Sequence, residues 1–127
     1  MDRDRALALG LGALLGGAAV AHFVRPQFFD RIVPEALPGP ARLWTYASGV
    51  VEAATAGLVV HPSTRRAGGL IAAALLVAVF PANIKDAIDA SDKSTPTRVV
   101  TYARLPVQIP LVLWGLRVAG IRGRVRG

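Results

Sequence analysis

The chain of 127 residues contains no cysteine. A disulfide-stapled scaffold and a cysteine-liganded zinc site are therefore excluded, because no thiol is present to build either. Charged residues are also scarce, at 18%, whereas hydrophobic residues reach 53% before the 13 glycines are counted. Soluble domains average about 25% charged and about 45–50% apolar residues even with glycine included. The composition therefore argues against a soluble globular domain, and the length allows one domain at most.

The sequence also lacks the motifs of common catalytic sites. It has no G-x-S-x-G elbow, no glycine-rich phosphate loop and no His/Asp/Glu spacing typical of a metal site. His22 and His61 fall at opposite ends of two apolar segments, which excludes a bis-histidine haem. The missing thiols remove quinone-linked disulfide chemistry as well. We therefore expect no catalytic residues, no metal and no haem, and we do not expect a stand-alone enzyme.

Four long apolar stretches dominate the chain, at residues 6–24, 41–60, 67–84 and 99–119. A helix that crosses a bilayer needs about 20 mostly apolar residues. None of the stretches alternates with the period of two that a membrane-spanning strand requires, so helices are expected. Only short polar or proline-containing segments separate them. The sequence thus predicts an all-α, integral membrane four-helix bundle that forms a single domain over residues 1–127.

The first stretch has an alternative interpretation as a secretory signal. Arg3 and Arg5 precede the apolar run, and the residues Ala19, Val20 and Ala21 match an A-x-A cleavage site. Three further apolar stretches follow, which favours a retained membrane helix.

The charges are divided unequally between the two sides of such a bundle. The side with both termini carries eight arginines and two aspartates, a net +6: Arg3, Arg5, Arg65, Arg66, Arg117, Arg122, Arg124 and Arg126 against Asp2 and Asp4. The opposite side carries six cationic and five acidic residues, a net +1. By the positive-inside rule, we expect both termini in the cytoplasm and a multi-pass protein of the plasma (inner) membrane. The basic residues then flank the spans, so no nucleic-acid partner is expected.

The first outer segment, residues 25–40, contains four prolines and an apolar group spaced for one helical face. That group is Phe28, Phe29, Ile32 and Val33. This pattern indicates a short helix at the membrane interface, or a loop packed over the mouth of the bundle. In either case the segment is expected to act as a lid.

Each predicted span contributes polar side chains to the outer half of the bundle. These candidate ligand-binding residues are His22, Ser48, Glu52, Asn83, Arg104 and Gln108. An unpaired charge at the bilayer centre costs about 3 kcal/mol on insertion scales, so Glu52 and Arg104 are predicted to form an intramembrane charge pair. The same residues could instead only hold the helices together by hydrogen bonds. Both interpretations stay open at this point.

Several short segments resemble the DoxX-like family of small four-helix membrane proteins. The matching segments are His22-Phe23 with Pro26, Ile32-Val33-Pro34 with Leu37-Pro38, Ser48-Gly49-x-x-Glu52, Phe80-Pro81-Ala82-Asn83-Ile84, and Ala103-Arg104-Leu105-Pro106-x-Gln108. The resemblance covers residues 7–119. It implies a plasma-membrane bundle with both termini inside, linked to quinone-coupled respiratory or redox-defence complexes as a small accessory subunit.

These observations lead to one expected function and two alternatives. The expected function is an accessory membrane subunit whose polar outer-half pocket binds a quinone or a lipid headgroup. Its partners would be the lipid bilayer and a membrane protein or a second copy of the chain. The alternatives are a structural or assembly protein without a ligand, and a small proton-coupled transporter in which Glu52 titrates against Arg104.

Overall fold

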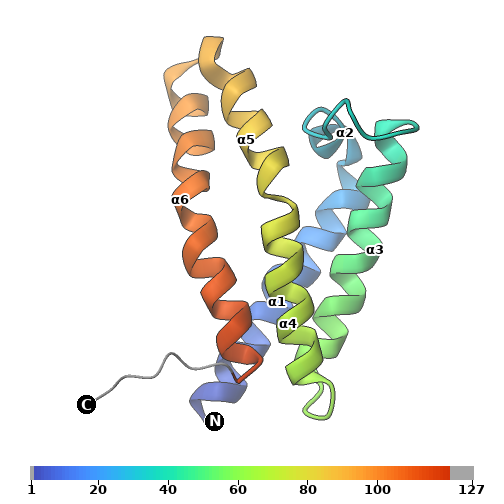
Figure 1. Ribbon diagram of the computed structural model, residues 1–127, viewed down its shortest axis with the longest axis vertical. Helices are drawn as coiled ribbons and strands as arrows, with labels where there is room; N and C mark the ends of the chain where they lie inside the picture. Colours follow the sequence, from blue (N-terminus) through green and yellow to red (C-terminus); the bar gives the residue numbers. More distant parts are fainter. Residues whose placement is uncertain (1, 121–127) are drawn as a thin grey trace.

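A computed structural model of the chain describes residues 2–120, and these residues form helices and connecting loops with no strand (Figure 1). The helices are α1 (Arg3–Val24), α2 (Pro26–Asp30), α3 (Ala41–Val60), α4 (Arg65–Ala78), α5 (Phe80–Asp89), the short 3₁₀ helix η1 (Ala90–Asp92) and α6 (Thr95–Val118). Arg122, Arg124 and Arg126 of the predicted basic tail lie outside the described residues.

Four helical segments in this part of the chain are long and apolar enough to cross a membrane. They are Arg3–Val24, Ala41–Val60, Arg65–Asp92 and Thr95–Val118, which confirms the predicted order of long apolar helices. The third segment extends eight residues beyond its predicted end at residue 84. The reason is that charged residues such as Lys85 and Asp89 end the apolar run without ending the helix.

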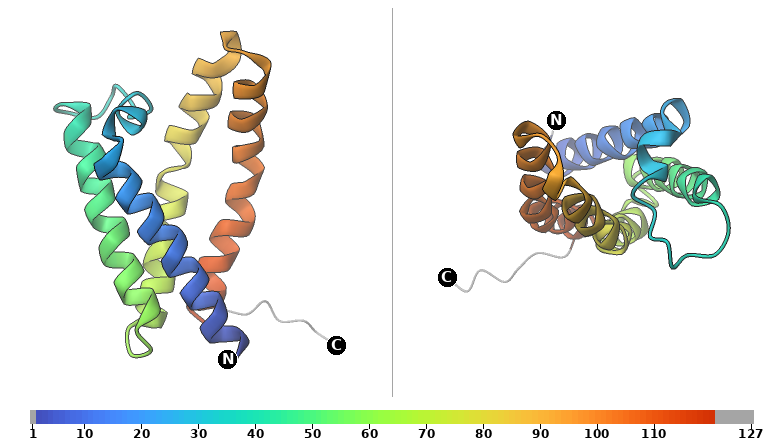
Figure 2. Two further views of the ribbon diagram at one scale, coloured as in Figure 1. Left: turned by 180° about the vertical axis from the view of Figure 1, so that it is seen from behind. Right: turned by 90° about the horizontal axis from the view of Figure 1, so that it is seen from above.

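The long helices form two pairs. Helix α1 packs along α3, and α6 packs along α4 and α5, while α3 and α4 connect the pairs through their shared turn. The two pairs separate toward the end that carries α2 (Figures 1 and 2). Helix α3 therefore has α1 and α4 as its neighbours, and α6 lies on the far side of α4.

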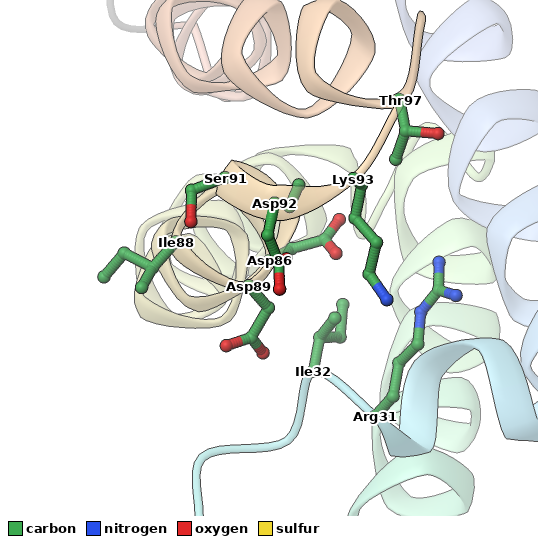
Figure 3. A pocket seen from close by; sticks show the side chains of 10 residues that line it. Arg31, Ile32, Asp86, Ile88, Asp89, Ser91, Asp92, Lys93 and Thr97 are labelled. Atoms are coloured by element: carbon green, nitrogen blue, oxygen red, sulfur yellow. The ribbon is translucent and has the colours of Figure 1, made fainter. Parts of the chain in front are cut away.

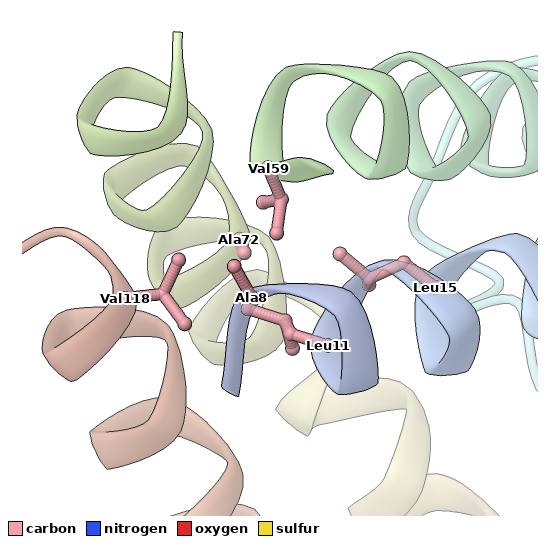
Figure 4. Packing of buried hydrophobic residues seen from close by; sticks show 6 residues of the cluster. All are labelled: Ala8, Leu11, Leu15, Val59, Ala72 and Val118. Atoms are coloured by element: carbon pink, nitrogen blue, oxygen red, sulfur yellow. The ribbon is translucent and has the colours of Figure 1, made fainter. Parts of the chain in front are cut away.

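The apolar core lies at the opposite end, near the termini, where the two pairs meet. Its buried cluster consists of Ala8, Leu11, Leu15, Val59, Ala72 and Val118 (Figure 4). The Trp114 indole packs against this cluster and donates a 2.9 Å hydrogen bond to the Leu7 carbonyl. Glycines allow the close approach here: a Cβ on Gly69 would lie 2.5 Å from the Ala119 nitrogen. Small residues of this kind are typical of packed membrane helices.

The segment between α1 and α3 covers the other end of the α1–α3 pair. It contains the expected short helix, α2, followed by a loop through residue 40. Asp30 accepts hydrogen bonds from the Thr45 hydroxyl (2.6 Å) and the Arg42 Nε (2.8 Å), both on α3. The Trp44 indole donates to the Pro38 carbonyl at 2.8 Å. We call residues 25–40 the lid, since these bonds fasten it over the bundle.

A fourth contact joins the lid to the second helix pair. Lys85 Nζ on α5 donates to the Arg31 carbonyl at 2.9 Å, and it also pairs with Asp89 at 2.9 Å. The lid is therefore held from both sides, by α3 and by α5.

Candidate functional site

The C-terminal end of α1 and the middle of α3 bring together two buried ionisable side chains, His22 and Glu52. His22 Nδ1 lies 3.3 Å from Glu52 Oε2, and the two residues are only 7% and 8% exposed. Gly49, one turn before Glu52, makes this approach possible. A Cβ at Gly49 would lie 2.8 Å from the Phe23 ring and 3.0 Å from the His22 Cβ. The sequence thus places the smallest residue where His22 and Phe23 of α1 approach α3 closely.

The orientation of the His22 ring is fixed by two contacts. Its Nδ1 donates to the Ala18 carbonyl one turn earlier, at 2.7 Å. Its face stacks on the Phe29 ring of the lid, with the ring centroids 3.7 Å apart. Because Nδ1 carries only one proton and directs it to Ala18, Glu52 Oε2 is left buried without a hydrogen-bond partner among the described residues.

A cavity of about 410 Å³ lies beneath the lid and reaches His22. The lid, α1, α3 and the region where α4 meets α5 contribute its wall: His22, Phe29, Ile32, Val33, Pro34, Leu37, Trp44, Thr45, Ser48, Leu75, Ala78, Val79, Pro81 and Ala82. Most of these side chains are apolar, and the polar ones gather on α1 and α3. A volume of this size and a lining of this kind are typical of small-molecule pockets.

Arg104 and Gln108 lie elsewhere, on α6. Arg104 donates to Gln108 Oε1 at 2.7 Å, and Gln108 Nε2 donates to the Leu76 carbonyl on α4. That carbonyl lies in the last turn of α4, just before the helix is interrupted at Val79 between α4 and α5. At this interruption, a side chain from α6 satisfies the Leu76 carbonyl.

The predicted charge pair between Glu52 and Arg104 is not formed. Within residues 2–120, Glu52 is paired with His22 and Arg104 is bonded to Gln108. The physical reason is the arrangement of the helices, since α3 packs on α1 and α4 whereas α6 packs on α4 and α5. Each of the two residues therefore has its partner within its own helix pair.

Asn83 on α5 completes the set of predicted residues. It is half-buried, and its Nδ2 lies buried without a hydrogen-bond partner in the described part of the chain. Its neighbours Pro81 and Ala82 line the cavity, but Asn83 does not. The six predicted residues thus divide into three groups: His22 and Ser48 in the cavity wall with Glu52 beside His22, Arg104 and Gln108 at the helix break, and Asn83 alone.

Sequence reasoning missed Thr45 and Asp30. Thr45, Ser48 and Glu52 follow one another at spacings of three and four residues on one face of α3, so helical periodicity could have identified Thr45. Nothing in the sequence indicates that Asp30 of the lid would reach Thr45. The hydrogen bond from Thr45, together with the bond and charge of Arg42, holds the pKa of Asp30 below its ordinary value.

A second hollow, of about 690 Å³, lies between the lid and the turn after α5 (Figure 3). Three aspartates, Asp86, Asp89 and Asp92, come from one side, and Arg31 and Lys93 face them. No group of three or more metal-ligating side chains was found in residues 2–120. The mixed charges fit the water-exposed end of the molecule rather than a buried ligand.

Comparison with protein families matches the chain over most of its length. Residues 11–119 match the family described as a domain of unknown function, DUF8561. The chain belongs to this family. The match to DUF8561 includes the lid and all six of the predicted site residues. Neither the curated proteins nor the solved structures contain a match to the chain.

Proposed function

We propose that this DUF8561 protein is an integral protein of the plasma membrane with both termini in the cytoplasm. The strongest support is the distribution of side chains, which is reversed relative to a water-soluble protein. Large apolar residues point outward on every long helix, with Val24, Ile88, Val100 and Ile109 between 65% and 69% exposed. The buried polar residues are His22, Thr45, Glu52, Thr55, Thr101 and Gln108. A bilayer covers such an exterior without the penalty that water would impose.

Within the membrane, the protein acts as a small accessory subunit that holds the polar head of a quinone or a lipid in the lid cavity. The observation that carries this proposal is the cavity itself, whose largely apolar wall carries the polar side chains of His22, Thr45 and Ser48 on α1 and α3. The unpartnered Glu52 Oε2 lies beside His22, 3.3 Å from its Nδ1, but Glu52 does not line the cavity. The apolar remainder of the wall suits a hydrocarbon ring or chain.

The resemblance to the DoxX-like family supports the quinone as ligand and a quinone-linked respiratory or redox-defence complex as the setting. In that setting, the partner would be another membrane protein or a second copy of this chain.

Native mass spectrometry from mild detergent tests the ligand directly. We expect the wild-type protein to retain a quinone or lipid molecule. Ser48→Phe fills the cavity from its wall and should abolish retention, whereas Ala47→Phe, on the exposed adjacent position of α3, should not. Equal retention by both variants, or no bound molecule in the wild type, would show that the cavity does not hold a ligand.

A purely structural role is the second candidate, and it is favoured by one observation. Gln108 satisfies the Leu76 carbonyl at the break between α4 and α5, so at least two of the six polar residues serve the fold. The transporter alternative required Glu52 to titrate against Arg104, and in the described chain Glu52 is instead beside His22 and Arg104 is bonded to Gln108.

A further inference from the structure

Several arginines at the end of the bundle that carries the termini are not paired within the protein. Within residues 2–120, the guanidinium groups of four of them have no hydrogen bond or ion pair: Arg3, Arg5, Arg66 and Arg117. Arg65 differs, because it donates to the carbonyls of Val59 and Val60 at the end of α3. At the opposite end, Arg42 and Lys85 are held in ion pairs with aspartates. The end with the termini therefore presents a group of unpaired positive charges.

An apolar groove lies between α6 and the helices α4 and α5, outside the lid cavity. It has a volume of about 540 Å³, and its wall consists of Val77, Phe80, Leu105, Pro106, Gln108, Ile109, Val112 and Leu113. Val77, Ile109 and Leu113 are 58% to 66% exposed, so the groove is open toward the exterior of the bundle. The side chain of Gln108 is bonded within the protein. The surface that the groove presents is therefore apolar.

Two of the unpaired arginines continue the walls of this groove toward the end with the termini. On α6, Arg117 follows Ile109 and Leu113 at steps of four residues, which keeps the three side chains on one side of the helix. On α4, Arg66 precedes Val77 by about three helical turns and therefore shares its face. Both arginines are exposed. Because α4 and α6 are in contact, the two guanidinium groups lie at the same end of the groove.

We propose that an anionic phospholipid binds here, with an acyl chain in the groove and its headgroup phosphate beside Arg66 and Arg117. The apolar wall suits a hydrocarbon chain, and guanidinium groups bind phosphate oxygens in a planar, two-point geometry. A water-soluble anion would leave the groove empty, and a lipid without net charge would leave the arginines unmatched. The inference rests on the proposed membrane location, but it does not depend on a ligand in the lid cavity.

Quenching by spin-labelled lipids in vesicles tests this site. Because the chain has no cysteine, one fluorescent NBD group can be attached at Ala74→Cys, an exposed position of α4 one turn before Val77. Ala54→Cys, on the exposed side of α3, reports on another face of the bundle. The open groove exchanges its lipid with the bilayer, so binding is measured in phosphatidylcholine vesicles rather than in detergent. Quenching by nitroxide-labelled phosphatidylglycerol is compared with quenching by nitroxide-labelled phosphatidylcholine.

We expect a preference for phosphatidylglycerol of at least about fivefold at residue 74, the effect of one basic side chain near an anionic lipid surface. At residue 54 the preference should stay below about twofold.

Variants of the arginines locate the headgroup. Arg66→Gln together with Arg117→Gln should reduce the preference at residue 74 below about twofold. The matched control is Arg25→Gln together with Lys93→Gln, which removes two exposed cations at the opposite end and should keep the full preference. Replacing both arginines of the site by lysine keeps the charges, so a preference above about twofold should remain.

Equal quenching by the two lipids at residue 74 would overturn the inference but leave the membrane location intact, since the label still meets lipid. A preference of the same size at residues 74 and 54, or one that survives the loss of both arginines, would also overturn it, because anionic lipid would then be attracted without a site. If lipid quenches the label at residue 54 but not at residue 74, protein covers the groove, and the inference fails. If neither label is quenched, the proposed membrane location fails as well.

Discussion

Gln108 is expected to stabilise the break between α4 and α5, and replacing it by leucine tests this role. Its side chain is only 5% exposed, and it joins Arg104 to the Leu76 carbonyl. Gln108→Leu leaves that carbonyl without a partner, for which soluble proteins give a penalty of about 1–3 kcal/mol. Side-chain hydrogen bonds between membrane helices average about 0.6 and reach about 1.7 kcal/mol.

We therefore expect Gln108→Leu to lower the free energy of unfolding by about 1–2 kcal/mol. The contribution of Arg104 is small, because its half-exposed side chain can turn toward the membrane surface. The assay is unfolding in mixed micelles with increasing SDS, followed by the circular dichroism of the helices. The matched control is Gln27→Leu on exposed α2, which should change little.

A second substitution separates the specific role of Gln108 from general packing. Gln108→Met keeps a flexible side chain of similar length but has no N–H group to donate to the Leu76 carbonyl. It should therefore destabilise the protein about as much as Gln108→Leu. The reasoning would be refuted if Gln108→Leu were as harmless as Gln27→Leu, or if Gln108→Met were tolerated.

Three further predictions concern the lid, the core and the topology. The pKa of Asp30 is lowered in the fold, so its ionised form stabilises the lid at neutral pH. This stabilisation is lost as the pH falls from the ordinary pKa of 3.8 through the lower folded value. Asp30→Asn should therefore narrow the difference in thermal stability between pH 7 and pH 3. Gly69→Ala should lower stability by about 1–3 kcal/mol in SDS unfolding, while Gly16→Ala, whose Cβ would meet nothing within 4 Å, should not lower it. In this cysteine-free chain, Ser91→Cys should react with an impermeant maleimide on intact cells and Ser63→Cys only after permeabilisation; the reverse pattern would invert the proposed orientation.

The number and order of the long helices could be predicted because apolar length is a property of each segment alone. Helix ends were less predictable, since Lys85 and Asp89 end the apolar run but are compatible with a helix. Hydropathy measures how well a segment suits lipid and does not report where its backbone hydrogen bonds stop.

The sequence identified individual residues of the candidate site but not which of them contact one another. Depth along the helices identified Glu52 and Arg104 as outer-half charges, but depth does not say which helices are neighbours. That depends on close contacts such as Gly49 against Phe23 and His22, which bring α1 to α3. Glu52 therefore contacts His22, and Arg104 remains with Gln108.

The central claim is that the lid cavity, beside His22 and Glu52, holds the head of an amphiphile. Photo-crosslinking with a diazirine-bearing alkylphenol, mapped by peptide mass spectrometry, tests it most directly. We predict labels on cavity-wall residues such as Phe29, Leu75 and Ala82, and we expect Ser48→Phe to abolish them. Labels confined to the apolar groove around Val112 and Leu113 on α6, or labels that persist at the lid in Ser48→Phe, would contradict the claim.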